Sequence, residues 1–343
     1  MKRRHLPHFC FTAGITTAGI IACMIFVVSC YRNPANTVTL LSSRPESQEK
    51  PIRMAFLTNM QGGEHWGNMK SGARFARSMH GNMTIEFYAP INEADYHGQT
   101  ELLQQVVDAD FDALVISSSH ATYAASTIQQ ALAKGMMVVT VDNDILAADG
   151  TSLAKAHVGT DSREVGKKAA MKGMELAPQV RKALVVASVP ESTSMMEKTA
   201  AITEIFSESG IEFQVIFCHA DATIAYGQVK AALESPVAID IIIALEEYAA
   251  HGVADALAET SAKARPVFIG SGNSRYQLNL LETGRMDALV VENSFTMGYL
   301  AVEAAASLAG GRNVVPVPVE FAIVTPLTMW EEHHQRLLFP LTN

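Results

Sequence analysis

Short apolar runs alternate along this chain with longer segments in which apolar residues recur at helical spacing. The runs cover 52–57, 84–88, 113–117 and 136–141, and a second series covers 183–188, 213–218, 239–245, 267–271 and 288–291. Segments of helical period lie between them, among them 66–79, 100–107, 121–134, 195–207, 224–233, 249–261 and 295–308. Apolar runs of this length without polar alternation are typical of strands buried on both faces of a parallel sheet. The pattern predicts an α/β fold with two successive doubly wound parallel-sheet lobes.

Polar residues follow the predicted strands at their carboxyl ends, which is the edge where open parallel sheets bind ligands. Carboxylate and amide oxygens suit the hydroxyl groups of a small molecule, and the indole of Trp66 suits the apolar face of a sugar ring. These polar segments therefore predict a binding cleft between the lobes. They cover 59–66, 142–144, 159–161, 190–194, 246–248, 270–273 and 292–294.

The start of the chain has the pattern of an export signal, because cations at 2–4 precede an uncharged stretch over 9–28. The sequence VVSC, which ends at Cys30, resembles the lipobox of bacterial lipoproteins, in which the cysteine is lipid-modified and becomes the mature N-terminus. Residues 20–23 match more weakly, since apolar residues continue after them. We expect a signal peptide over 1–29 and lipidation at Cys30. An uncleaved membrane anchor is the alternative.

Residues 30–50 are polar and lack a sustained period, which is typical of a tether. Either form of the export segment places the body outside the cytoplasmic membrane and holds it there. Cysteine usage agrees, because Cys218 is the one cysteine after Cys30 and leaves no disulfide within the body. We expect Cys218 to be a small buried residue.

Composition and motifs exclude several classes of function. With 48% hydrophobic and 18% charged residues the 343-residue chain is globular, and a net charge of −9 argues against nucleic acid as a partner. No Walker A, G-x-S-x-G, H-E-x-x-H or C-x-x-C pattern occurs, and the glycines at 270–272 lack the third glycine of a dinucleotide loop. We therefore expect no enzyme, no cofactor and no metal. Residues 331–334 offer metal-ligand types, but we interpret them as part of a solvated tail.

The order of several segments resembles the ribose- and galactose-type periplasmic sugar-binding proteins, the type I solute-binding family. The segments are VTVDND, HVGTDSREVGKKAA, SMMEKTAAI, ALEEYAAHGVADAL and VVENSFTMG, and the resemblance extends over about 52–325. It implies two lobes joined by three crossovers, near 158–161, 245–248 and 292–294, which close over a small ligand.

The resemblance also implies lobes that are discontinuous in sequence. It assigns 51–158 plus 271–292 to the N-terminal lobe, 162–268 plus 296–328 to the C-terminal lobe, and 329–343 to a tail. The implied hinge residues are Thr160, Asp161, Glu247 and Asn293.

Carried over position by position, the resemblance implies a ligand site in which Trp66 stacks on a sugar and Asp142 pairs with hydroxyls. Lys198 stands where the family usually has Arg, which keeps the charge but loses the bidentate geometry. Gly272 stands where the family normally has a ligand-binding Asp, and Asn273 is the candidate replacement. The implied ligand residues are Trp66, Asp142, Asn143, Lys198, Glu246, Asn273 and Glu292.

These residues also limit the ligand, because three carboxylates face one cation. An anionic ligand would enter an already negative, partly desolvated site, so we exclude sugar phosphates and acidic sugars. A neutral sugar or polyol is favoured, and an amino sugar or another cation is a candidate.

Structural interpretations compete with these roles. Trp66 could pack within its lobe, Asp142 could cap a helix and Lys198 could be an exposed helical lysine. Glu246 and Glu247 could favour a helix start, and because they are adjacent we expect only one of them in the cleft.

Two functions fit these features. A lipid-anchored receptor could deliver its ligand to the permease of an ABC importer, or its closed form could be read by a chemoreceptor or a sensor kinase. A transcriptional regulator with the same ligand-binding fold is rejected, because an export segment occupies the place of the DNA-binding module.

Overall fold

The computed structural model of the chain describes residues 51–260, 265–315 and 318–340. The expected signal peptide, Cys30 and the tether up to residue 50 lie outside these ranges. Within them, no helix combines the length and the apolar character needed to cross a bilayer.

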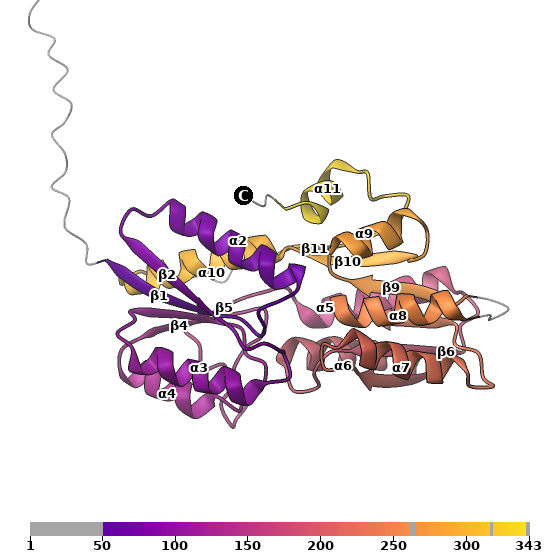
Figure 1. Ribbon diagram of the computed structural model, residues 1–343, viewed down its shortest axis with the longest axis horizontal. Coiled ribbons are helices and arrows are strands. Elements are labelled where there is room, and N and C mark those ends of the chain that lie inside the picture. The colour runs from indigo at the N-terminus through magenta and orange to yellow at the C-terminus, as the bar shows by residue number, and fades with distance from the viewer. Residues whose placement is uncertain (1–50, 261–264, 316–317, 341–343) are drawn as a thin grey trace, which may run out of the picture. The chain divides into compact units, whose positions relative to one another are not determined.

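The first sheet is parallel and has the strand order β2-β1-β3-β4-β5. Its central strands are apolar on both faces, and helices cover both faces with two separate cores (Figure 1). The strands are β1 (Ile52–Leu57), β2 (Met83–Tyr88), β3 (Ala113–Ile116), β4 (Met137–Val141) and β5 (Ala156–Val158). The helices between them are α2 (Glu64–Ser78), α3 (Tyr96–Asp108) and α4 (Ala125–Ala133).

The second sheet has the order β11-β10-β9-β8-β6-β7, and only β11 is antiparallel to its neighbour. Its strands are β6 (Lys182–Ala187), β7 (Glu212–Phe217), β8 (Ile241–Ala244), β9 (Val267–Ser271), β10 (Ala288–Glu292) and β11 (Phe321–Val324). Its helices are α5 (Ser162–Leu176), α6 (Thr193–Glu208), α7 (Ala222–Leu233), α8 (Glu247–Glu259), α9 (Arg275–Glu282) and α11 (Glu332–Leu338). The predicted α/β fold with two parallel-dominated sheets is confirmed.

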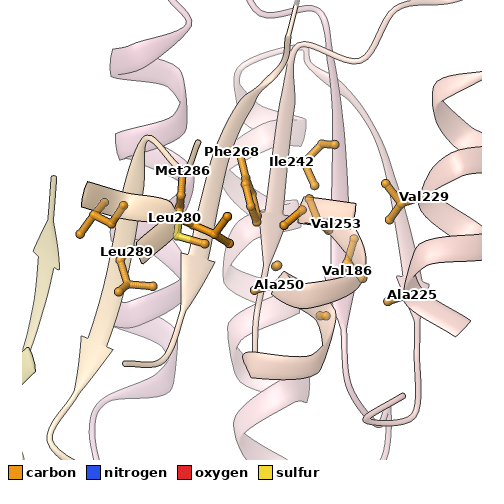
Figure 2. Close-up of a cluster of buried hydrophobic side chains, with 14 of the residues drawn as sticks. Val186, Ala225, Val229, Ile242, Ala250, Val253, Phe268, Leu280, Met286 and Leu289 are labelled. Atoms are coloured by element: carbon orange, nitrogen blue, oxygen red, sulfur yellow. The ribbon is translucent and has the colours of Figure 1, made fainter. Parts of the chain in front are cut away.

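Each face of the second sheet has its own core. Figure 2 shows one of them, in which Ile242 and Phe268 of the sheet lie against Val253 of α8. Cys218 is buried in this core as a free thiol, as expected. The predicted tail over 329–343 is wrong in part, because Met329 and two leucines of α11 also belong to this core.

The chain passes between the two sheets after β5, after β10 and after α10 (Ser294–Ala309). The predicted crossovers at 158–161 and 292–294 coincide with the first two passages. The one predicted at 245–248 is wrong, because β8 and α8 pack against each other within the second lobe. The remaining passage lies at 310–320, where Val319 N–H donates to Gly159 O beside the first passage (3.1 Å).

The predicted segment 271–292 and the α10 part of 296–328 are therefore exchanged between the lobes, whereas β11 lies in the second lobe as predicted. β10 belongs to the second lobe, because Ala288 and Leu289 pair with β9. α10 belongs to the first lobe, because it packs on α2 and on β3, β4 and β5. An apolar helix can cover either sheet, so the residue pattern over 295–308 did not decide between them.

α2 and α10 approach each other backbone to backbone through two glycines. A Cβ built on Gly72 would lie 1.9 Å from Phe295 O, and one on Gly298 would lie 1.9 Å from Met69 O. The contact therefore has no room for a methyl group. It holds the returning helix in the first lobe.

We expect Gly72→Ala and Gly298→Ala each to lower the free energy of unfolding by about 1–3 kcal/mol, because the added methyl groups overpack this contact. Gly67→Ala is the matched control, since Gly67 lies in α2 and a Cβ there meets nothing within 4 Å. The control should stabilise the protein by about 0.5–1 kcal/mol through helix propensity. Urea unfolding measures the stability of all three variants. A Gly298→Ala variant as stable as the wild type would contradict the close packing of α2 against α10.

Candidate ligand-binding site

A cavity of about 70 Å³ lies among residues that follow the strands of both sheets. All the ligand residues implied by the resemblance line it: Trp66, Asp142, Asn143, Lys198, Glu246, Asn273 and Glu292. Their contact with a ligand stays a prediction. Three further charged residues line the cavity: Glu247, which the resemblance implies as a hinge residue, and His65 and Glu93, which were missed as ligand-site candidates.

Trp66 lies in the first turn of α2 and is both a core residue and a lining residue. Its side chain is 6% exposed and packs with Phe56 and Met69. The His65 ring meets its indole edge to face, with ring centroids 4.7 Å apart. The interpretation that Trp66 packs within its lobe is therefore correct. The residue also contributes an aromatic surface to the cavity.

Asp142 directly follows β4 with a backbone φ of 61°, a left-handed conformation that Asp tolerates better than most residues. Its carboxylate accepts a hydrogen bond from Asn143 Nδ2 at 2.8 Å and lies 3.7 Å from His65 Nε2, a charge contact rather than a hydrogen bond. Burial opposes its ionisation, but the adjacent His65 and Lys198 lower its pKa overall. The alternative role as a helix cap is wrong, because Asp161 caps the next helix.

Lys198 of α6 and Glu292 at the end of β10 form a buried ion pair with Nζ and Oε2 2.6 Å apart. Their side chains are only 3% and 9% exposed, so the interpretation of Lys198 as an exposed helical lysine is wrong. Burial by itself lowers the pKa of Lys198, but the charges of Glu292 and Asp142 raise it overall. Thr160 Oγ1 donates to the other oxygen of Glu292, which ties this pair to the passage after β5.

Glu246 caps the N-terminus of α8, where its carboxylate accepts from the backbone N–H groups of Tyr248 and Ala249. Burial, reinforced by the charge of Glu93, raises the pKa of Glu246 to about 8 even though these N–H groups favour the carboxylate. Glu247 also lines the cavity and accepts from Glu64 N–H at 2.8 Å. The expectation that only one of the two enters the cleft is wrong, because both side chains at this helix start turn to the sheet edge.

Glu93 lies in the loop between β2 and α3 and connects the lobes. Its Oε1 accepts from Asn59 Nδ2 at 3.0 Å, and its Oε2 accepts from Ser188 Oγ of the second lobe at 2.7 Å. Burial raises its pKa. It follows the second predicted strand, so the rule that polar residues gather after strands would have found it.

The presence of Gly272 where the family normally has a ligand-binding Asp has a steric explanation. Its φ is 129°, and a Cβ there would lie 2.4 Å from Gln277 Oε1, so the family's Asp does not fit. Asn273 occupies the cavity wall instead, where it accepts from Asn68 Nδ2 and donates to Leu337 O, both at 3.3 Å. One side chain thereby connects α2, the cavity and the C-terminal helix.

The lobes are in direct contact around the cavity. Asn143 Oδ1 accepts from Ser194 N–H at 3.0 Å and from Ser194 Oγ at 2.7 Å, and Asp144 N–H donates to Thr193 Oγ1 at 2.8 Å. The arrangement is therefore a closed one in which both lobes contribute walls.

Three of the four predicted hinge residues lie at passages between the lobes. Thr160 contacts Glu292, Asp161 caps α5 by accepting from Glu164 N–H, and Asn293 caps α10 by accepting from Thr296 N–H. Glu247 is not a hinge residue, because no passage occurs at α8. That part of the prediction is wrong.

Among the described residues one group combines metal-ligand types, Glu331, His333 and His334, with ligand atoms within 4.8 Å of one another. His334 Nδ1 already contacts Thr328 O at 2.8 Å, and none of the three residues lines the cavity. The cavity lining presents carboxylates, amides, aromatic rings and one lysine.

The sequence model of the periplasmic binding protein domain matches residues 54–313, so the chain belongs to this family, with the type I fold. Its family is one of binding proteins rather than enzymes. The D-ribose/D-allose-binding protein of Pseudomonas aeruginosa is 22% identical over 290 residues, covering 80% of this chain and 89% of that protein.

Solved structures with the same fold include an ABC transporter solute-binding protein from Agrobacterium vitis with bound D-fucose. It has 20% identity and a TM-score of 0.79, and the match covers 84% of this chain and all of that one. One from Bacillus halodurans with bound myo-inositol has 17% identity, a TM-score of 0.75 and coverage of 84% and 98%. A chain of the XylFII–LytSN complex has 20% identity, a TM-score of 0.73 and coverage of 80% and 98%.

The raised pKa of Glu246 predicts a pH dependence of stability. In the folded protein the pKa of Glu246 is about 8, above the ordinary pKa of a glutamate side chain. The contribution of Glu246 to the stability of the fold is therefore complete at low pH and is lost as the pH rises toward 8. Between about pH 5 and pH 9 the wild type should lose on the order of 3 kcal/mol relative to Glu246→Gln. Urea unfolding of the ligand-free protein measures this difference.

Glu234→Gln is the control for this measurement, because Glu234 is exposed on the same lobe. Its pH profile should follow the wild type. Parallel profiles for the wild type and Glu246→Gln would show that Glu246 ionises normally.

Proposed function

We propose that this protein is an extracytoplasmic, lipid-anchored solute receptor that captures a small hydroxylated molecule by closure of its two lobes. The ligand class is a neutral sugar or polyol, with amino sugars included. The closed form then presents the ligand to an ABC importer. The observation that supports this proposal most directly is the cavity, in which residues from both lobes bring hydrogen-bond acceptors and an aromatic ring to one enclosed space.

The chemistry of the lining supports this ligand class. Carboxylate and amide oxygens accept from hydroxyl groups, and Trp66 supplies a flat apolar wall. A phosphate or acidic sugar would meet Glu93 and Glu246, which have no cationic nitrogen within 4 Å among the described residues, so the lining offers no free cation to pair with the charge of an anionic ligand. The similar proteins named above bind D-ribose, D-allose, D-fucose or myo-inositol.

The anchor and the location rest on the first thirty residues. The lipobox-like VVSC and the polar stretch that follows it support a lipid on Cys30 and a tether to residue 50. Membership of the periplasmic binding protein family supports the same location.

A sensory role is the alternative to import. It is supported by the similar chain in the XylFII–LytSN complex, whose assembly with a second protein suggests that lobe closure can be read by a partner other than a permease. Both roles use the same ligand site.

A thermal-shift screen of neutral sugars, polyols and amino sugars tests the ligand class. A ligand at 100 times its dissociation constant should stabilise the protein by about 2.7 kcal/mol. Asp142→Asn should abolish the shift, because it removes the charge while Asn still tolerates the positive φ. Asp144→Asn is the matched control in the same loop, outside the lining. Full affinity of Asp142→Asn for the compound that binds would contradict the site.

Cys30→Ser should abolish the uptake of labelled fatty acid into the protein by cells that express the full chain, because the thiol that would be acylated is absent. Cys218→Ser is the control, since this thiol is buried in the second lobe. A wild-type protein that takes up no label and keeps its export segment would show that the segment is an uncleaved anchor.

A further inference from the structure

The charged groups of the cavity are unevenly paired. Lys198 Nζ lies 2.6 Å from Glu292 Oε2, and His65 Nε2 lies 3.7 Å from Asp142 Oδ2. These two contacts use both cations of the lining. Glu93 and Glu246 have no cationic nitrogen within 4 Å among the described residues, although both line the same cavity.

Strand order brings these two acids together. β8, which leads into Glu246, lies between β9 and β6 in the second sheet. β6 leads into Ser188, whose hydroxyl donates to Glu93. Neighbouring strands are about 4.8 Å apart, so Ser188, which holds the Glu93 carboxylate, lies about one strand spacing from Glu246. The electrostatic effect of Glu93 on Glu246 agrees with this closeness.

Buried groups around the two acids lack hydrogen-bond partners. Ser271, on the other side of Glu246, lines the cavity, is 3% exposed and has no partner for its Oγ. Asn59 donates to Glu93, but its own Oδ1 has no donor and the residue is fully buried. Buried polar groups are nearly always satisfied, so these atoms indicate a missing hydrogen-bonding group, and the acceptors among them call for a donor.

An ammonium group has the properties that this end of the cavity lacks. It carries a positive charge and three N–H donors and accepts nothing, whereas a hydroxyl supplies one donor and no charge. Charge-assisted hydrogen bonds are roughly twice as strong as neutral ones. The rings of Trp66 and Tyr248 in the lining add aromatic surface that favours cations.

We propose that the space between Glu93 and Glu246 receives the protonated amino group of the ligand, which makes the ligand an amino sugar or an amino polyol. The inference rests on the proposed function, because it narrows the ligand of the same cavity. Glu93 is then a specificity-determining residue that also joins the lobes through Ser188, so binding of the amine and closure are coupled.

Calorimetry with matched sets of compounds tests the proposal. Each set contains an amino sugar, its parent sugar and its N-acetyl derivative, for D-glucosamine, D-galactosamine and D-mannosamine. In at least one set the amino sugar should bind about tenfold or more tighter than both neutral compounds, since a hydrogen bond to a charged group contributes about 1.5–3 kcal/mol. Glu93→Gln and Glu246→Gln should each reduce this preference to about threefold or less.

Asp144→Asn is the matched control, because Asp144 is an acid of the loop after β4 that lies outside the cavity lining. It should leave the ratio of amino sugar to parent sugar unchanged. A ratio reduced equally in all three variants would mean that the general charge around the cavity, rather than the space between Glu93 and Glu246, selects the amine, and it would overturn the proposal.

The outcomes separate this inference from the proposed function. A parent sugar that binds as tightly as its amino derivative would overturn the ammonium site and leave a sugar receptor in place. If neither these compounds nor the neutral sugars and polyols of the thermal-shift screen bind, the proposed function itself fails.

Discussion

The buried ion pair between Lys198 and Glu292 is the charge contact on which the cavity wall of the second lobe depends. It joins α6 to the end of β10, where the chain leaves the second lobe, and Thr160 attaches it to the neighbouring passage. Removing one partner would leave a buried charge uncompensated, which is strongly destabilising. The same pair forms part of the cavity wall, so two chain passages between the lobes and the candidate ligand site share one electrostatic contact.

The cavity illustrates how burial and pairing separate the properties of similar carboxyls. Asp142 has His65 and Lys198 nearby, and its pKa is lowered despite burial. Glu93 and Glu246 lack a close cation among the described residues, and burial raises the pKa of both. These carboxyl groups of one cavity therefore differ in charge and in hydrogen-bonding role.

Much of the site could be predicted because the carboxyl ends of parallel strands meet at one edge. Asp142 directly follows β4, Glu246 lies two residues after β8 and Glu292 ends β10, and local order along the chain was enough to locate them. Glu93 was overlooked because a loop separates it from β2. His65 was missed because its contact with Asp142 joins segments distant in sequence.

Apolar periodicity by itself determined the two parallel-dominated sheets, since strands buried on both faces must be apolar throughout. The tertiary structure alone decided which sheet receives α10 and where the last passage lies. An apolar helix satisfies the burial requirement of either lobe, and the choice depends on a close fit such as that of Gly72 and Gly298. The pairing of charges was decided in the same way, because the distance between two buried side chains from different lobes is a property of the folded chain.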